Sequence, residues 1–202
     1  MGKKSILKCD FLQGAISNRL RFGGGRGQHL PKAVGLKGGQ SPTIIDATAG
    51  LGRDAFLLAS LGSQVTLIER SDTIHELLAT GMEAARQAGG QHKDIIDRMT
   101  LVHGDSIALL PHMRADVVLV DPMHPTRQKS ALVKAEMRAI RNIVGIDEDQ
   151  QLLIETALTM ATKRLVLKWP AKAAPLDGLR PASHQIIGKS VRYDVFMINK
   201  AV

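Results

Sequence analysis

The chain has 202 residues, of which 44% are hydrophobic, so it can bury the core of one globular domain and does not have the composition of a disordered chain. Its formal net charge of +8 favours an anionic partner such as nucleic acid, although a basic surface can also serve solubility alone, and an aromatic content of 3% disfavours a sheet that stacks bases on Phe and Tyr. The single cysteine, Cys9, excludes a disulfide framework and a four-cysteine zinc site, and together with the lack of a membrane-spanning apolar run it indicates a reducing, cytoplasmic compartment.

The first 41 residues are rich in glycine and in basic residues and have no regular hydrophobic period. The stretch NRLRFGGGRGQHLPKAVG contains Arg19, Arg21 and Arg26. We expect residues 1–41 to form an irregular basic segment that packs on or near a cofactor cleft, with a flexible tail as the alternative. An ordered domain is then expected over residues 42–202.

From residue 43 onward, short apolar runs alternate with segments of helical period. The runs predict strands over 43–47, 64–69, 99–104 and 115–121. Helices are predicted over 53–62, with Gly62 as its stop, over 73–87 and, as a short turn, over 106–113.

The second half continues this alternation and then departs from it. Helices are predicted over 130–145 and 147–162, the second capped by Asp147 or Asp149, and a strand over 163–170. Two strands then meet near Gly188 without a helix between them, so they should form a hairpin with one antiparallel strand. The whole pattern predicts an α/β fold, with a mostly parallel sheet covered by helices on both faces.

Ligands of such sheets bind beyond the carboxyl ends of the strands, where the winding reverses. The first strand leads into DATAGLGRD, in which Gly50 and Gly52 permit a tight turn and the close approach of a ligand. A dinucleotide fingerprint would need glycine where Ala55 stands. Asp46, with glycines four and six residues later, better matches the loop that holds the amino acid end of S-adenosylmethionine, although a plain glycine-rich turn has the same pattern.

Polar residues also follow the next two strands. Glu69 can accept hydrogen bonds from both hydroxyls of a ribose, which suits S-adenosylmethionine and NAD equally, and Arg70 can flank the adenine or lie in solvent. Asp105 and Ser106 can hydrogen-bond an adenine edge, or Asp105 can simply cap the next helix.

The fourth strand ends on Asp121, which Pro122 follows. The amino group of a nucleobase is a poor nucleophile because its lone pair is delocalised into the ring. A carboxylate and a backbone carbonyl of such a turn can accept its two protons and favour a pyramidal nitrogen, while proline stiffens the turn and donates no hydrogen bond. We therefore predict Asp121 and Pro122 as the catalytic turn, with Met123 and His124 lining the base slot, and catalysis by positioning and fixed electrostatics.

Four segments, FGGGRG, DATAGLGRDAF, DPMHPTRQKSALVKAEMR and ATKRLVLKWP, resemble the bacterial small-subunit ribosomal RNA methyltransferase J family over nearly the whole chain. The resemblance implies a Rossmann-like class I S-adenosylmethionine-dependent methyltransferase that acts on the N2 amine of a guanine in 16S rRNA. It implies cofactor contacts at the matching positions, which are Arg53, Asp54, Glu69, Arg70, Asp105, Ser106 and Asp121.

Family members usually carry Phe where His124 stands, and imidazole stacks on a base more weakly. Basic residues beyond the catalytic turn, together with one from the N-terminal segment, are predicted to contact RNA phosphates, with a solvated helix face as the alternative for each. These residues are Arg127, Lys129, Lys134, Arg138 and Arg26. His75, His103 and His112 lack ligand spacing, so no metal is assigned.

Three alternatives to methylation of 16S rRNA stay open at this point. They are an amino methyltransferase for another RNA or for DNA, a non-catalytic RNA-binding factor in ribosome assembly, and a nicotinamide dehydrogenase. The exact nucleotide, the choice between naked rRNA and the assembled small ribosomal subunit, and the oligomeric state do not follow from the sequence.

Overall fold

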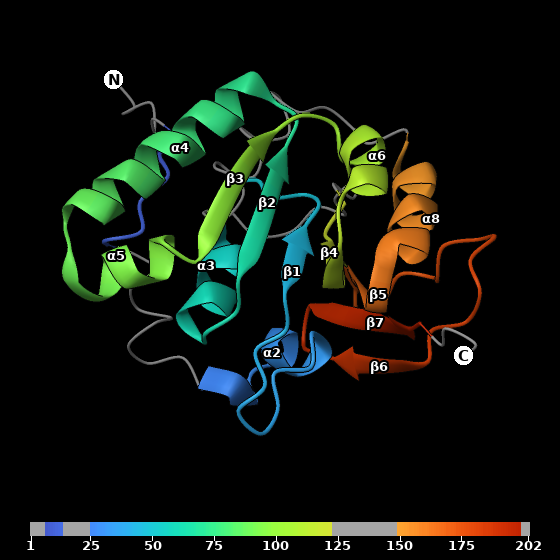
Figure 1. Cartoon of the computed structure of the whole chain (residues 1–202). Coiled ribbons are helices and arrows are strands. Elements are labelled where there is room, and N and C mark those ends of the chain that lie inside the picture. The colour runs from blue at the N-terminus through green and yellow to red at the C-terminus, as the bar shows by residue number, and fades with distance from the viewer. Residues whose placement is uncertain (1–6, 14–24, 123–148, 199–202) are drawn as a thin grey trace, which may run out of the picture.

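A computed structural model of the chain describes residues 7–13, 25–122 and 149–198, which form one seven-stranded sheet in the order β3-β2-β1-β4-β5-β7-β6 (Figure 1). The strands are β1 (Ile44–Asp46), β2 (Val65–Glu69), β3 (Met99–His103), β4 (Ala115–Val120), β5 (Ala161–Pro170), β6 (His184–Ile187) and β7 (Val191–Met197). The first five strands pair in parallel, whereas β7 runs antiparallel to both of its neighbours, β5 and β6. The predicted mostly parallel sheet with an antiparallel C-terminal strand is therefore confirmed.

The winding of the sheet reverses between β1 and β4. Asp46 at the end of β1 is in register with Leu67 of β2 on one side and with Leu119 of β4 on the other. The chain passes from β1 to β2 and β3 in one direction and reaches β4 and β5 in the other. Such a switch point leaves a crevice at the carboxyl ends of the strands, and this is where a ligand is expected.

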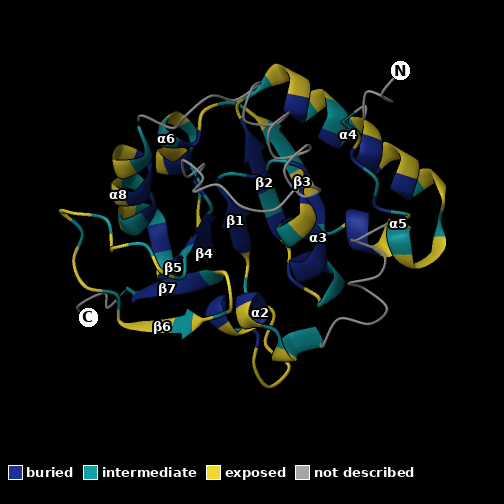
Figure 2. Cartoon of the chain, turned by 180° about the vertical axis from the view of Figure 1, so that it is seen from behind, coloured by how far each residue is buried: buried dark blue, intermediate teal, exposed yellow. Residues whose placement is uncertain are grey.

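Helices cover both faces of the sheet. They are η1 (Gly25–Gly27), α2 (His29–Ala33), α3 (Arg53–Ser60), α4 (Asp72–Gln87), α5 (Gly90–Ile96), α6 (Ser106–Leu109), η2 (Leu110–His112) and α8 (Gln150–Met160). One hydrophobic cluster joins α2, α3, α4 and α5 to one face, and a second joins the α6–η2 segment and α8 to the other. Figure 2 shows the buried strands enclosed between these layers.

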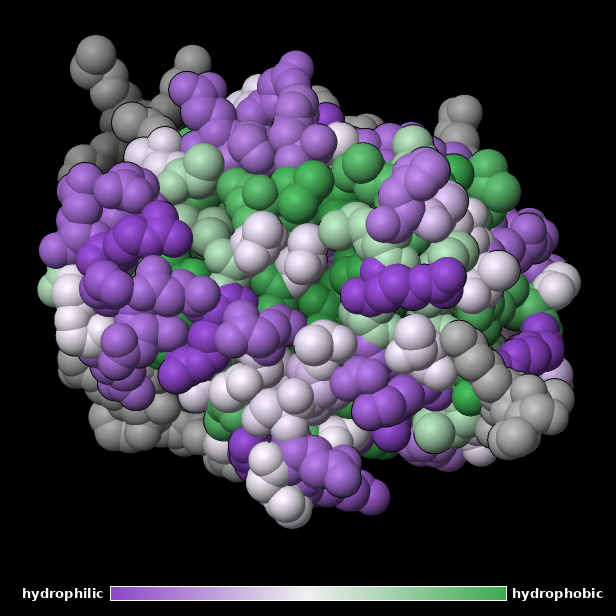
Figure 3. Space-filling view, viewed as in Figure 1, coloured by the Kyte–Doolittle hydropathy of each residue, from purple (hydrophilic) through white to green (hydrophobic). Residues whose placement is uncertain are grey.

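Helix α4 illustrates how the sequence sets this packing. Ser71 caps its first turn by accepting a hydrogen bond from the backbone N–H of Ile74. Buried residues then recur at helical spacing, at Ile74, Leu78 and Met82, so one face meets the core. In the space-filling view, hydrophilic side chains cover the outer side of α4 and α5, and hydrophobic surface lies between α4 and α6 (Figure 3).

Two of the described α-helices were not predicted. The first 41 residues contain α2, which buries Leu30 and Ala33 and packs near β6 and β7, so this part of the segment is not irregular. Helix α5 begins directly after Gly89, in the stretch 88–98 for which no element was predicted. The helix predicted over 130–145 lies outside the described residues.

Candidate active site

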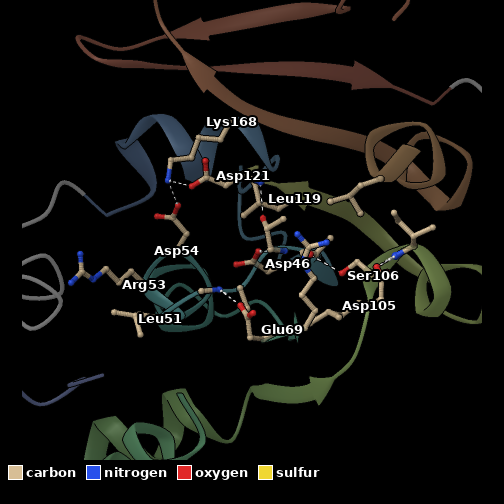
Figure 4. A pocket seen from close by; sticks show the side chains of 18 of the residues that line it. Asp46, Leu51, Arg53, Asp54, Glu69, Asp105, Ser106, Leu119, Asp121 and Lys168 are labelled. Carbon is tan, nitrogen blue, oxygen red and sulfur yellow. Dashed lines mark hydrogen bonds and ion pairs between the residues drawn. The ribbon is translucent and has the colours of Figure 1, made fainter. Parts of the chain in front are cut away.

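A pocket of about 330 Å³ opens at the carboxyl ends of the parallel strands, at the switch between β1 and β4 (Figure 4). Its walls come from the loop after β1, the first turn of α3, the carboxyl ends of β2, β4 and β5, and the amino-terminal ends of α6 and α8. Nine of the residues predicted to bind a cofactor line this one pocket: Asp46, Gly50, Arg53, Asp54, Glu69, Arg70, Asp105, Ser106 and Asp121.

Glu69 links the loop after β1 to the loop after β2. Its Oε2 atom accepts a hydrogen bond from the backbone N–H of Gly50 at 2.9 Å, and its Oε1 atom accepts one from Ser71 at 2.8 Å. Burial raises the pKa of Glu69 above its ordinary value, and the two N–H donors oppose that rise. The result is a fixed carboxylate in the pocket wall with acceptor capacity left for a ligand hydroxyl.

Asp105 and Ser106 stand where the chain leaves β3 and enters α6. The Oδ1 atom of Asp105 accepts a hydrogen bond from the N–H of Ile107 at 2.9 Å, so the helix-cap interpretation is confirmed, and Asp105 also lines the pocket. The hydroxyl of Ser106 is buried and donates to the carbonyl of Ala47 at 2.7 Å. This bond fixes the distance between the ends of β1 and β3.

Asp46 lies at the bottom of the pocket and is 3% exposed. Its Oδ1 atom accepts a hydrogen bond from the N–H of Thr48 at 3.2 Å. Burial, and after it the nearby charge of Asp54, raises the pKa of Asp46 from 3.8 to about 7. This carboxyl therefore titrates near neutral pH in the folded protein.

The predicted catalytic residue, Asp121, is tied to the cofactor loop. Its backbone N–H donates to the hydroxyl of Thr48 at 2.7 Å, which joins the end of β4 to the loop after β1. Its side chain stays 41% exposed toward the pocket. Burial raises the pKa of Asp121, and the ammonium of Lys168 opposes that rise.

Lys168, in β5, was not predicted as a site residue. Its Nζ atom lies 2.8 Å from Oδ2 of Asp54 and 2.7 Å from Oδ2 of Asp121, so it bridges α3 to the end of β4. Burial alone would lower the pKa of Lys168, but the charges of the two carboxylates and their hydrogen bonds outweigh burial and raise it. The side chain is therefore a cation at neutral pH.

Other predicted residues lie outside the pocket lining. Gly52 faces the core, where an added Cβ atom would come within 2.8 Å of Leu78 and 3.3 Å of Phe11. Pro122 is buried behind Asp121. Arg26 donates to the carbonyls of Gln40 and Leu61, at the far end of α3 from the pocket, so its predicted RNA contact has no support from this position. The remaining predicted substrate residues lie outside the described ranges: Met123, His124, Arg127, Lys129, Lys134 and Arg138.

Three polar residues that line the pocket were not among the predicted site residues. Thr48 sits between the landmarks Asp46 and Gly50, Lys168 sits inside a strand pattern, and Asp149 had been interpreted as a helix cap. Asp149 does occupy the N-cap position of α8, but its carboxylate pairs with Arg70 at 2.9 Å and makes no cap hydrogen bond. For Lys168, the sequence signal that could have been used is its position near the carboxyl end of a predicted strand, the same end at which the neighbouring strands carry acids.

The chemistry of this lining fits S-adenosylmethionine. Gly50 has a positive φ of 53°. Among the residues that the structure describes, an added Cβ atom there would meet nothing nearer than the carbonyl oxygen of Thr48 at 4.0 Å, which leaves space for a ligand. Fixed carboxylates suit a ribose, an adenine amine and a sulfonium. Among the described residues, no group of three or more His, Cys, Asp or Glu side chains is placed to hold a metal ion. Within the same ranges, no helix is both long and apolar enough to cross a membrane.

Comparison with known proteins agrees with this geometry. A family model that describes SAM-dependent methyltransferases matches residues 1–198. The ribosomal RNA small subunit methyltransferase J of Agrobacterium fabrum is 59% identical over 189 residues, which cover 94% of this chain and 91% of that protein. The protein of the same name from Brucella anthropi is 59% identical over 193 residues, covering 96% of this chain and 94% of the relative.

Solved structures give the same result. A SAM-dependent methyltransferase from Neisseria gonorrhoeae superimposes with a TM-score of 0.78 at 33% identity, covering 100% of this chain and 78% of that one. The rRNA methyltransferase AviRa of Streptomyces viridochromogenes shares the fold, with a TM-score of 0.53 at 13% identity over 82% of this chain and 80% of that one. The chain belongs to the ribosomal RNA small subunit methyltransferase J family, and its cofactor is S-adenosylmethionine.

Proposed function

We propose that this chain transfers a methyl group from S-adenosylmethionine to the exocyclic N2 amine of one guanosine in 16S rRNA of the small ribosomal subunit. The observation that carries the proposal is the position of Asp121, a carboxylate at the end of β4 that faces the pocket beside the cofactor loop. The relatives named for ribosomal RNA of the small subunit support the choice of substrate. A ribosomal substrate also implies a cytoplasmic enzyme.

On the cofactor side, each part of the pocket has one task. Glu69 would accept the ribose hydroxyls, Asp105 the exocyclic amine of adenine, and the loop around Gly50 would hold the amino acid end. The bound cofactor supplies an electrophilic methyl group on a positively charged sulfur. The carboxylates of Asp54 and Asp121 lie beside this part of the pocket and together carry more negative charge than Lys168 neutralises.

On the substrate side, Asp121 would orient the amine. Its carboxylate and a backbone carbonyl of the turn that Pro122 stiffens would accept hydrogen bonds from the two N–H groups of the amine. These bonds would turn the nitrogen lone pair toward the methyl group. The methylated amine loses a proton readily, so Asp121 need not remove one in a separate step. Positioning of this kind can remove a large part of the activation barrier of a reaction between two bound molecules.

RNA binding would come from the basic residues beyond the catalytic turn and from the N-terminal segment. The net charge of +8 suits a substrate that carries one phosphate per nucleotide. In the described part of that segment, Cys9 donates to the carbonyl of Leu51, a pocket residue, and Phe11 stacks on Phe56 of α3 at 4.8 Å. These contacts support the proposal that the segment packs near the cofactor cleft.

The test is transfer of a tritiated methyl group to 30S particles from a strain that lacks this protein, followed by mass spectrometry of the nucleosides. We expect one N2-methylguanosine per particle from the wild-type chain. Asp121→Ala should reduce the rate by at least about 100-fold while the protein still binds S-adenosylmethionine by calorimetry. Asp94→Asn, an exposed acid on α5, is the matched control and should transfer at the wild-type rate.

Different failures point to different alternatives. A wild-type chain that binds S-adenosylmethionine but labels only another RNA or DNA would replace the substrate and keep the reaction class. Binding to the particle without any binding of S-adenosylmethionine would favour a non-catalytic assembly factor. Normal transfer by Asp121→Ala would remove the proposed role of that residue.

A further inference from the structure

Lys168 is a charged residue that the proposed reaction does not yet use. It extends from β5 between two acids that belong to different elements, Asp54 in the first turn of α3 and Asp121 after β4 (Figure 4). Its side chain is 22% exposed, and that of Asp54 is 16% exposed. A lysine loses hydration and side-chain freedom in such a position, so the two contacts must compensate for both.

Binding of the cofactor does not by itself explain a cation at this position. A positive charge beside the pocket opposes the binding of a sulfonium, which also carries a positive charge. The second contact of Lys168 is more informative, because it is made to the one carboxylate that the proposed mechanism assigns to the substrate amine. That contact engages only Oδ2 of Asp121.

We propose that Lys168 is a positioning residue that holds Oδ2 of Asp121 and keeps this carboxylate ionised, so that Oδ1 is left to accept a proton of the target amine. The identity of that amine rests on the proposed function, but the relation between Lys168 and Asp121 does not. Asp54 has a supporting part, because it holds the other side of the same ammonium at 2.8 Å.

The charges around Lys168 predict what its removal does. Asp54 from α3, Asp121 from the end of β4 and Asp46 from β1 interact with it electrostatically, and Tyr193 of β7 is its register partner across the ladder. Without the ammonium, three carboxylates share the site with no bridging cation, and such a group takes up a proton at higher pH. A protonated Asp121 would present a donor where the amine needs an acceptor.

The test measures Asp121 directly. Chains labelled with ¹³C at the aspartate carboxyl carbon are titrated by NMR, and the Asp121 signal is assigned from its absence in Asp121→Asn. In Lys168→Met we expect the titration midpoint of Asp121 to rise by at least about one pH unit. Lys168→Arg, which keeps the charge, should leave it within about half a unit, and Asp54→Asn added to Lys168→Met should bring it partly back.

Activity and cofactor affinity complete the experiment. With Lys168→Met, the acid limb of the pH–rate profile on 30S particles should shift to higher pH by the same amount as the NMR midpoint. The Kd for S-adenosylmethionine should stay within about threefold of the wild-type value. A midpoint and profile unchanged from wild type would overturn the inference. A large loss of cofactor affinity with an unchanged Asp121 midpoint would also overturn it, because Lys168 would then be a cofactor ligand.

Two controls separate the possible causes of failure. If circular dichroism finds Lys168→Met unfolded, Lys168→Gln replaces it, because its amide still fills the space beside Asp54 and Asp121. If the wild-type chain transfers no methyl group to the particles, the proposed function fails, but the NMR titration still decides whether Lys168 keeps Asp121 ionised.

Discussion

The carboxylate of Glu69 accepts a hydrogen bond from the backbone N–H of Gly50 at 2.9 Å, across 19 positions of sequence. This bond joins the ends of β1 and β2, and it holds the glycine-rich loop against the wall of the pocket that would meet the ribose. The same acid thus shapes the loop and, in the proposed function, would present acceptors to the ligand. Loss of the charge should therefore affect binding more than folding.

Glu69→Gln should weaken the binding of S-adenosylmethionine by about 10–100-fold, because hydrogen bonds to a charged acceptor contribute about 1.5–3 kcal/mol each. An amide NH₂ group would also face one of the N–H donors that the carboxylate now satisfies. Calorimetry measures the Kd. The matched control is Glu76→Gln on the exposed side of α4, for which an unchanged Kd is expected, and equal Kd values for the two variants would contradict the assignment.

Asp46 makes the folded protein less stable as the pH rises. Its pKa is about 7 in the folded chain and 3.8 as the ordinary value, so the folded state holds a proton that the unfolded state releases. The stabilisation is complete below about pH 4 and is lost as the pH rises to about 7. Within this window, each rise of one pH unit lowers the free energy of unfolding by about 1.4 kcal/mol.

Asp46→Asn should remove this pH dependence, since the amide oxygen can still accept the hydrogen bond from Thr48. Between pH 5 and pH 8, the free energy of unfolding of the wild type should fall by about 2–3 kcal/mol relative to the variant. Urea unfolding at the two pH values measures the difference. Parallel pH profiles for the two proteins would mean that Asp46 is ionised at pH 5 in the folded state.

The sheet could be predicted because its signals are local. Runs such as 64–69 and 115–121 are apolar, short and bounded by turns, and their alternation with helices implies a parallel sheet. The convergence of Asp46, Glu69 and Asp105 on one pocket follows from the same rule, because parallel strands end at the same edge.

The partners of these acids could not be predicted in the same way. Lys168 lies 47 positions from Asp121 and 114 positions from Asp54, and only the order of β4 and β5 in the sheet brings them together. The position of Gly52 outside the pocket lining could not be predicted for a related reason. A glycine next to a ligand loop and a glycine next to a core leucine have the same sequence pattern, and only the side chains of Leu78 and Phe11 beside Gly52 distinguish them.

A buried ion pair holds the loop after β5. Arg192 and Asp194 of β7 are about 5% exposed and pair at 2.9 Å, and Arg192 also donates to the carbonyls of Pro170 and Ala173. Asp194→Asn should lower the free energy of unfolding by about 3–5 kcal/mol, because it leaves the guanidinium buried without a counter-charge. Chemical denaturation measures this, with the exposed acid variant Asp177→Asn as control; a loss below about 1 kcal/mol would contradict it.

The two glycines of the cofactor loop should fail in opposite ways when a methyl group is added. Both have positive φ, 53° at Gly50 and 68° at Gly52, so backbone strain should destabilise each alanine variant by a similar amount, about 1–2 kcal/mol. Only at Gly52 would the new Cβ atom also press on the core, 2.8 Å from Leu78. Overpacking of this kind adds about 1–3 kcal/mol.

Gly52→Ala should therefore lose about 2–5 kcal/mol of unfolding free energy, whereas Gly50→Ala should lose about 1–2 kcal/mol. Gly50→Ala should instead weaken the binding of S-adenosylmethionine, by at least about tenfold, since its methyl group enters the space open to the ligand. Thermal unfolding and calorimetry on the same two variants measure both effects. If Gly50→Ala binds the cofactor as tightly as the wild type, the loop does not hold the ligand at that position, because in the described part of the chain the added methyl group meets only the carbonyl oxygen of Thr48, at 4.0 Å.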